Sequence, residues 1–543
     1  MFRTAELGRT VSKDDFHEAA PLLRAELLEI QQQLRDAPFP VIIVFGGVDG
    51  AGKSETVNLL NEWLDPRWLS TRAYGKPSDE MEERPEYWRY WRDLPPKGRI
   101  GIFLSCWYSR PLLDRVYEKT TDAEFDEALD EVNTFEKELA DDGALILKFW
   151  MHLGKKQQKE RLRSLEKDPL TRWRVTQVDW DHWHMYDKFI SAAERNIMRT
   201  SSAHSQWQIV EGLDKRYRSL TVATTILESI RKHLKRTKVQ RRMIKALEKR
   251  SPSASSSASE PGPGSVLVSA ETGGDDAPDG VVIPLSKVTI LNHLDMSLTI
   301  ATKDYRKELE KYQGKLNQAQ RRARELGIST VLVFEGWDAA GKGGAIRRTT
   351  AALDARDYQV IPIAAPTDEE RAQHYLWRFW RHLSRAGRVT VFDRSWYGRV
   401  LVERVEGFAS EAEWNRAYAE INDFEDQLVR HGIVLCKFWV HITKEEQLAR
   451  FKAREGVVYK RWKLTDEDWR NRERWDEYEL AVNDMVERTS TSVAPWTLVE
   501  GNSKRYSRIK VISTVCDSLT TAIQRVEKAA GKTSGGKNLK RTG

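Results

Sequence analysis

Cysteine, long apolar runs and a secretory leader are what this sequence lacks. Only three of its 543 residues are cysteine, and they stand far apart at Cys106, Cys436 and Cys516. This spacing excludes a disulfide framework and a cysteine-ligated metal site. No apolar run approaches the roughly 20 residues of a membrane-spanning helix, and residues 1–16 lack the apolar core of a secretory signal. We therefore predict a cytoplasmic protein without a membrane partner.

What is present is an ordinary globular composition, 40% hydrophobic and 31% charged. The chain is longer than one hydrophobic core usually serves, so two domains are expected. A net charge of +7 is compatible with a polyanion, nucleic acid or membrane surface as partner, or with solubility alone. Net charge does not distinguish these possibilities, so the positions of the basic residues in the sequence must.

A repeat organises the whole sequence. Residues 47–54 read GVDGAGKS and residues 336–344 read GWDAAGKGG, each after a short apolar run. The loop lysines Lys53 and Lys342 are 289 residues apart, and the same offset relates the two Lys-Phe-Trp triplets. The chain is therefore a duplicated domain.

Composition places the boundaries of the two copies. We predict a first domain over 15–248 and a second over 286–528. Residues 249–285 are rich in Ser, Pro, Gly and Ala and hold few large apolar side chains, which predicts a flexible linker. The small, polar, basic residues 529–543 are predicted to form a disordered tail.

The order of elements predicts the α/β class. In the second copy we expect a leading helix over 303–325, strands over 388–393, 433–442 and 496–500, and a long helix from 465 through 486. Short apolar strands that alternate with helices are typical of a parallel sheet covered on both faces. The same order is expected in the first copy.

The glycine-rich loops carry the first chemical signal. A strand that enters Gly-x4-Gly-Lys and leaves as a helix presents backbone N–H groups to an anion, and the lysine adds a mobile positive charge. The alternative is a glycine-rich turn that only packs a helix on the sheet. Two copies in the same strand-to-helix context argue against this alternative for the loop of Lys342.

Two carboxylates in the second copy predict a magnesium site. Ser54 stands where a phosphate loop usually ligates Mg²⁺, but the second copy has Gly343 there and needs other ligands. Asp338 lies within the loop, and Asp393 ends an apolar strand at the place of a Walker B aspartate. Alone, Asp393 could be a strand-end cap. Beside Asp338 and Lys342 we favour a Mg²⁺ ligand.

The first copy has lost several of these groups. At the 289-residue offset, Asp393 becomes Leu104 and Arg394 becomes Ser105. Three further cations, Arg347, Arg348 and Lys460, correspond to Asn58, Leu59 and Thr171. Leucine cannot bind a metal, and phosphoryl transfer depends on positioning and on neutralising phosphate charge. We predict that the first copy is catalytically silent, with a loop still able to bind an anion.

Two basic segments leave alternatives open. Residues 450–463 contain six Lys or Arg, which form either a solvated helix face or a lid that closes over phosphate. Their place after the third strand favours the lid. Residues 376–381 read LWRFWR. They form either a buried aromatic stripe with arginines on its rim or, through Arg378 or Arg381, a grip on an acceptor phosphate.

Three segments of the second copy carry a resemblance to a known family. FEGWDAAGKGG ends at Gly344, FDRSWYGR ends at Arg399 and YKRWK ends at Lys463. They resemble the signature segments of the polyphosphate kinase 2 family. The resemblance implies two tandem P-loop kinase domains, similar to thymidylate kinase, with a helical lid. Tandem members transfer the terminal phosphoryl group of inorganic polyphosphate to AMP and form ADP, so AMP and polyphosphate are the implied partners.

The resemblance also implies roles for individual residues. The implied catalytic residues are Asp338, Lys342, Asp393 and Arg394, with Mg²⁺ on the two aspartates. The residues implied to bind phosphate and polyphosphate are Gly336, Gly341, Gly343, Gly344, Arg399, Arg404, Lys460 and Arg461. Those implied to line the nucleotide side are Pro366, Thr367 and Arg378.

Other functions stay open at this point. The chain could be an ATP-dependent nucleotide or small-molecule kinase, or a polyphosphate-dependent kinase that acts on ADP or GDP. A non-catalytic polyanion or nucleic-acid binder is a different class, and the complete set of Asp338, Lys342 and Asp393 argues against it. The sequence also leaves open whether two chains pair as a homodimer.

Overall fold

A computed structural model describes residues 1–250, 289–456 and 466–538 of the chain. The described residues form two compact units, and each unit holds one five-stranded sheet. The first unit consists of Met1–Arg241 and Ala365–Leu383, and the second of Arg242–Ala364 and Ser384–Gly543. None of the described helices is long and apolar enough to cross a membrane.

The first sheet has the strand order β2-β3-β1-β4-β5, and all neighbouring strands are parallel. The elements of the first copy are α1 (Lys13–Leu34), β1 (Val41–Gly47), α2 (Lys53–Trp63), β2 (Leu69–Ala73), α3 (Asp79–Glu82), α4 (Trp88–Asp93), β3 (Ile100–Leu104), α5 (Ser109–Val116), α6 (Asp122–Asp141), β4 (Leu145–His152), α7 (Lys155–Lys167), α8 (Gln177–His184), α9 (Tyr186–Thr200), β5 (Trp207–Glu211) and α10 (Lys215–Arg250).

The second sheet has the equivalent order, read from its other edge as β10-β9-β6-β8-β7, and is also parallel throughout. The elements of the second copy are α11 (Thr302–Glu325), β6 (Thr330–Gly336), α12 (Lys342–Thr350), β7 (Tyr358–Pro362), α13 (Asp368–Arg371), α14 (Trp377–Trp380), β8 (Val389–Asp393), α15 (Val402–Val405), α16 (Glu411–Arg430), β9 (Val434–His441), α17 (Lys444–Glu455), α19 (Asp466–Glu473), α20 (Trp475–Thr489), β10 (Trp496–Glu500) and α21 (Lys504–Asn538).

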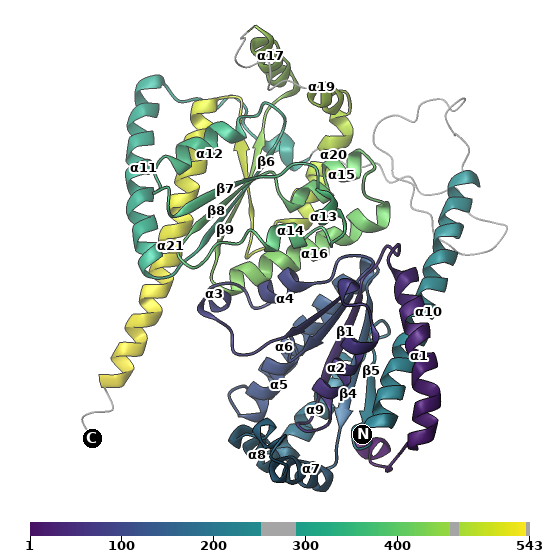
Figure 1. The fold of residues 1–543 in the computed structure, drawn as a ribbon. Helices are drawn as coiled ribbons and strands as arrows, with labels where there is room; N and C mark the ends of the chain where they lie inside the picture. Colours follow the sequence, from purple (N-terminus) through teal and green to yellow (C-terminus); the bar gives the residue numbers. More distant parts are fainter. Residues whose placement is uncertain (251–288, 457–465, 539–543) are drawn as a thin grey trace, which may run out of the picture. The chain divides into compact units, whose positions relative to one another are not determined.

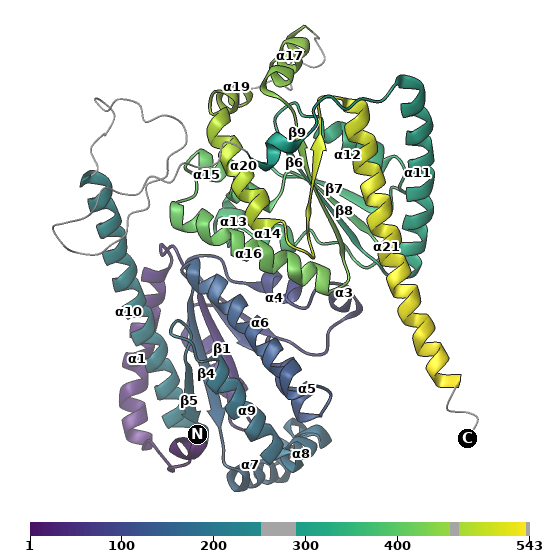
Figure 2. The same cartoon turned by 180° about the vertical axis from the view of Figure 1, so that it is seen from behind.

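Helices cover both faces of each sheet. In the first unit α1, α2 and α10 pack on one face, and α5, α6 and α9 pack together over the other (Figure 1). In the second unit α11, α12 and α21 lie on one face, and α16 and α20 on the other, as the reverse view also shows (Figure 2). The central strands are apolar and buried because neither face meets water. The predicted α/β class is confirmed.

The long helix predicted from 465 through 486 is wrong. The structure divides it into α19 and α20, with Arg474 between them at φ −94° and ψ 28°. The break lets Trp475 stack face to face on Trp337, with 3.7 Å between ring centroids. Periodicity could not show this break, because no proline or glycine marks it.

Both long C-terminal helices run past the domain ends read from composition. α10 continues to Arg250 and α21 to Asn538. Of the predicted linker, 251–285 lies outside the described residues, as does 539–543 of the predicted tail. The domain boundaries therefore stay a prediction.

The buried aromatic stripe expected at residues 376–381 is confirmed as core, and the first copy has an equivalent stripe. The side chains of Trp88, Trp91, Trp377 and Trp380 are all buried. Within the first unit, Trp91 stacks on Trp380 with ring centroids 6.0 Å apart. Apolar burial of these large rings accounts for the Trp-x-x-Trp spacing.

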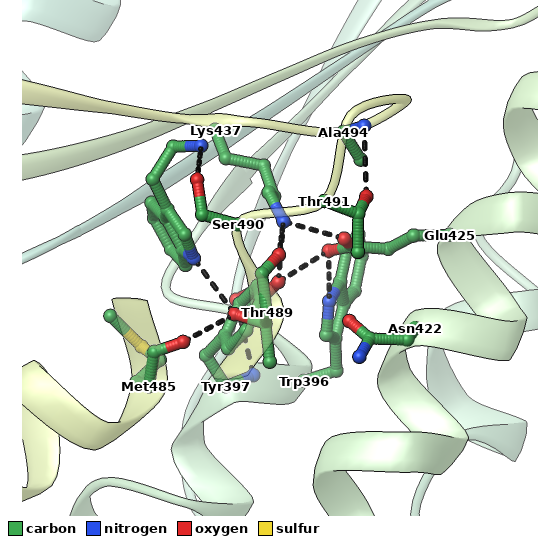
Figure 3. Close-up of polar contacts among 12 residues, drawn as sticks. Trp396, Tyr397, Asn422, Glu425, Lys437, Met485, Thr489, Ser490, Thr491 and Ala494 are labelled. Carbon is green, nitrogen blue, oxygen red and sulfur yellow. Dashed lines mark hydrogen bonds and ion pairs between the residues drawn. The ribbon is translucent and has the colours of Figure 1, made fainter. Parts of the chain in front are cut away.

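A buried polar network supports each copy. In the second copy Lys437 on β9 donates to the carboxylate of Glu425 at 2.6 Å, to the hydroxyl of Tyr397 at 2.9 Å and to the carbonyl of Thr489 at 2.8 Å (Figure 3). The indole of Trp396 also donates to Glu425. Every charge is paired, as burial requires.

The first copy repeats these bonds and adds one from the hydroxyl of Ser205 to Glu136 at 2.9 Å. Lys148 donates to Glu136 at 2.7 Å, to the hydroxyl of Tyr108 at 2.9 Å and to the carbonyl of Thr200 at 2.7 Å. The Lys-Phe-Trp triplets of the repeat therefore belong to the interior, and this lysine holds the fold in both copies.

Candidate active site

The phosphate loop of the second copy follows β6, the central strand of its sheet. Gly336 has φ +148°, and a Cβ there would lie 2.4 Å from the carbonyl oxygen of Val440, so only glycine fits. Gly341 has φ +115°, and α12 begins at the next residue, Lys342. The loop thus ends at a helix N-terminus, which favours a bound anion.

The loop forms one wall of a pocket of about 510 Å³. The ammonium group of Lys342 donates to the carbonyl of Gly336 at 2.6 Å and lies at this wall. The pocket is lined by Trp337, Asp338, Ala339, Ala340, Gly341, Lys342, Gly343, Gly344, Arg347, Arg348, Pro362, Ile363, Asp393, Arg394, Arg454 and Asp468. Four arginines and a lysine beside three aspartates fit a phosphate ester with a cation.

The second strand of the site is β8, which pairs with β6 so that Asp393 lies opposite Phe334. Parallel strands end at the same edge, which brings Asp393 to the loop. The next residue, Arg394, has φ +65°, and its backbone N–H donates to the carbonyl of Phe334 at 3.0 Å. Its guanidinium reaches back to Asp338 at 3.3 Å. The structure therefore brings together all four predicted catalytic residues.

Asp338 is held by residues that the sequence did not single out. Asn471 on α19 donates its side-chain amide to the carboxylate at 3.0 Å, and Gln447 on α17 donates to the backbone carbonyl at 3.2 Å. The equivalent positions in the first copy are His182 and Gln158. Both positions are polar in each copy. This shared polarity is a signal in the repeat that could have identified Asn471 and Gln447.

Arg450 fixes the loop from behind. One terminal nitrogen donates to the carbonyls of Ala339 at 2.9 Å and Ala340 at 2.7 Å, and the other to those of Gly501 at 2.7 Å and Asn502 at 3.0 Å. Its side chain is 6% exposed. This arginine belongs to the basic segment predicted as a lid or a solvated face, and it is neither of these. Its buried guanidinium holds the loop by its backbone carbonyls, and we call it the loop bracket.

An aromatic cluster lies under the loop. Trp337 donates its indole N–H to Nδ1 of His441 at 3.2 Å, and Trp439 donates to the same atom at 3.4 Å. Burial lowers the pKa of His441 to about 4, so this nitrogen stays an acceptor at neutral pH.

The structure places the other predicted residues away from the loop or does not describe them. Arg399 pairs with Glu403 and Arg404 with Asp484, and neither arginine lines the pocket. Pro366, Thr367 and Arg378 lie in Ala365–Leu383, which groups with the first unit. Lys460 and Arg461 lie outside the described residues. The roles of these residues stay predictions.

The first copy keeps the loop and lacks the second carboxylate. Leu104 ends β3 where Asp393 ends β8. The loop aspartate, Asp49, lies 2.6 Å from Nδ1 of His182 and 3.6 Å from the ammonium of Lys53. Burial acts to raise the pKa of Asp49, but Lys53 and His182 lower it to about 2.

In the first copy a different arginine serves as the loop bracket. Arg218 on α10 donates to the carbonyls of Gly212 at 2.7 Å and Ala51 at 3.5 Å, the counterparts of Gly501 and Ala340. Arg218 also pairs with Glu55 at 2.7 Å, and so does Arg161, the counterpart of Arg450, at 2.8 Å. Glu55 replaces Gly344 of the second copy and pairs with three arginines beside the loop, because Arg174 also lies 3.7 Å from its carboxylate.

The fold and the phosphate loop together define a P-loop phosphotransferase. The family model "Polyphosphate kinase 2 (PPK2)" matches residues 10–238 and 299–527, which retain the 289-residue offset. The chain belongs to the polyphosphate kinase 2 family.

Two named relatives cover most of the chain. The "Polyphosphate:AMP phosphotransferase" of Pseudomonas aeruginosa is 49% identical over 97% of this chain and 100% of its own. That of Acinetobacter johnsonii is 36% identical over 88% and 90%. A crystal structure of a "putative polyphosphate kinase 2" from Pseudomonas aeruginosa has a TM-score of 0.81 and 46% identity, and the match covers 97% of this chain and 100% of that one.

Proposed function

We infer that this protein transfers the terminal phosphoryl group of inorganic polyphosphate to AMP, forming ADP and a chain shorter by one phosphate. The observation that carries this inference is the joining of Asp338, Lys342, Asp393 and Arg394 around one pocket. Near full-length similarity to enzymes named polyphosphate:AMP phosphotransferase supports AMP as the acceptor. A donor without base or ribose can be recognised only by its charge, which fits the basic lining of the pocket.

The chemistry we propose is in-line attack of an AMP phosphate oxygen on the terminal phosphorus of polyphosphate. The P–O bond to the chain breaks, and the shortened chain leaves with the electron pair. Loop N–H groups and Lys342 orient the transferred group, while Arg394, Arg347 and Arg348 neutralise charge that develops on its oxygens and on the leaving phosphate.

The pocket fits a magnesium ion. Asp393 accepts no side-chain hydrogen bond from any described residue, and it lines the pocket with Asp338. Among the described residues no group of three or more His, Cys, Asp or Glu could hold a metal, and Mg²⁺ is commonly bound by one or two carboxylates plus substrate phosphates. We propose that Asp338 and Asp393 hold Mg²⁺, which polarises the reacting phosphates when bound.

The remaining assignments are also proposals. We propose that 15–248 is a degenerate domain and 286–528 the catalytic domain, that Arg399, Arg404, Lys460 and Arg461 contact polyphosphate, and that Pro366, Thr367 and Arg378 contact the nucleotide. The three cysteines are free and buried, which supports a reducing, cytoplasmic location. We also propose that two chains pair as a homodimer, and a measurement of mass in solution tests this.

One assay tests the proposed function. Purified protein is given AMP, Mg²⁺ and polyphosphate without ATP, and ADP is measured; parallel reactions offer ADP as acceptor or ATP as donor. We expect ADP from AMP and polyphosphate. A protein that uses ATP and ignores polyphosphate would be an ordinary nucleotide kinase, and the proposal would be wrong.

A further inference from the structure

A buried glutamate lies beside the site, outside the residues that line the pocket. Glu335 is the last residue of β6 before Gly336 of the loop, and it is 5% exposed. Its carboxylate accepts a hydrogen bond from the hydroxyl of Ser395 at 2.8 Å. Burial raises the pKa of Glu335, while Lys342 opposes this shift. Glu335 is not among the residues that line the pocket, and the chemistry above does not use it.

Ser395 connects Glu335 to the catalytic turn. The serine follows Asp393 and Arg394, and its hydroxyl oxygen accepts from the backbone N–H of Tyr397 at 3.3 Å. One hydroxyl thus caps the next turn of chain and donates to Glu335. The bond to Glu335 fixes the direction of that hydroxyl, because its single proton has one acceptor.

The first copy shows that the fold does not need this pair. There Glu335 corresponds to Gly46 and Ser395 to Cys106. A Cβ on Gly46 would lie 3.1 Å from the ring of Trp150, so that ring fills the room. The turn is still made: Ser105 has φ +48°, in the same left-handed region as Arg394.

The first copy therefore lacks the Glu335–Ser395 pair as well as the proposed catalytic groups, but it retains the left-handed turn. By contrast, the buried acids Glu136 and Glu425 occupy equivalent positions in the two copies, and each accepts from the equivalent Lys, Tyr and Trp. A carboxylate that the fold required would be expected in both copies, as these two are.

We propose that Glu335 is a positioning residue: through Ser395 it holds the Asp393–Arg394 turn in the arrangement that phosphoryl transfer needs. The proposal rests on the proposed function of the second copy. Groups that orient catalytic side chains without touching substrate commonly change activity by about 10–100-fold when removed.

The test compares E335A, E335Q, S395A and the double variant E335A/S395A with wild type in the polyphosphate and AMP assay. We expect E335A and S395A each to lower kcat by about 10–100-fold, with KM for AMP changed by less than about twofold. E335Q keeps an oxygen acceptor for Ser395 and should retain kcat within about threefold of wild type. The double variant should be no slower than the slower single variant, because both changes remove the same bond.

The control for folding is S395C, which installs the residue of the first copy. A thiol is a weak donor, so S395C should lose kcat while its Tm stays near that of wild type. Full kcat in E335A would overturn the proposal, and so would E335Q as slow as E335A, additive losses in the double variant, or a loss confined to KM. A wild-type protein that formed no ADP would instead overturn the proposed function, and this inference with it.

Discussion

The two copies agree in their interior and differ around the loop. Lys148 and Lys437 make the same buried bonds, and both sheets have the same strand order. Among the described residues, the loop of the second copy has Asp393 and Arg394 beside it, where the first copy has Leu104 and Ser105. The fold therefore packs with or without these charged groups, and each copy serves as a natural control for the other.

The arginine that holds the loop differs between the copies, although the carbonyls that it binds are equivalent. Arg450 and Arg218 bind equivalent carbonyls from different helices, α17 and α10. The backbone of the loop needs an arginine behind it in both copies, because its inward carbonyls are buried and need donors. Which helix provides the arginine is free to change.

The largest expected effect follows from copying the first site into the second. Asp393→Leu should lower kcat at least about 10³-fold, because it removes a carboxylate that we propose to hold Mg²⁺ beside the reacting phosphates. Steady-state assays with AMP and polyphosphate measure it. Stability should change little, since the first copy folds with Leu104 there.

The matched control for that variant is Leu104→Asp in the first copy. It should leave the activity of the whole chain unchanged and should not restore Asp393→Leu. An Asp393→Leu enzyme with a tenth or more of wild-type kcat would contradict the assignment of the catalytic half.

A change to the buried network should affect both copies alike. Lys437→Met and Lys148→Met each leave a buried glutamate unpaired and should lower the local free energy of unfolding by about 3–5 kcal/mol. Hydrogen exchange read separately for each copy measures this, because a chain of two units does not unfold in one step. A large loss in only one copy would show that the two networks are not equivalent.

Removing the bracket arginine should affect activity in the second copy and only stability in the first. Arg450→Ala should lower kcat/KM by about 10–100-fold, because the loop that orients phosphate loses its support. Adding Ser507→Arg, which copies the position of Arg218, should recover part of this loss.

Arg218→Ala is the control for the bracket. It should weaken hydrogen-exchange protection in the first copy and leave turnover intact. If Arg218→Ala reduced turnover as strongly as Arg450→Ala, the first loop would have a part in catalysis and the comparison would fail.

Much of the fold and the centre of the site could be predicted from the repeat. The loop glycines, Lys342 and the strand-end Asp393 follow rules of local geometry, so sequence spacing was sufficient to find them. Arg450 was expected in a lid or on a solvated face, because a basic run does not reveal that one of its members folds back on backbone carbonyls. Asn471 and Glu335 were missed because their roles depend on contacts across the sheet and between helices, which no local pattern encodes.

We expect that one of the two loops works in catalysis, and the loop lysines test this most directly. Lys342 and Lys53 each donate to the carbonyl of the first loop glycine at 2.6 Å, so the two changes remove the same local bonds. With AMP, Mg²⁺ and polyphosphate, Lys342→Ala should form ADP at less than about 1% of the wild-type rate, while Lys53→Ala keeps more than about half. The opposite result, or an equal loss from both changes, would contradict the account.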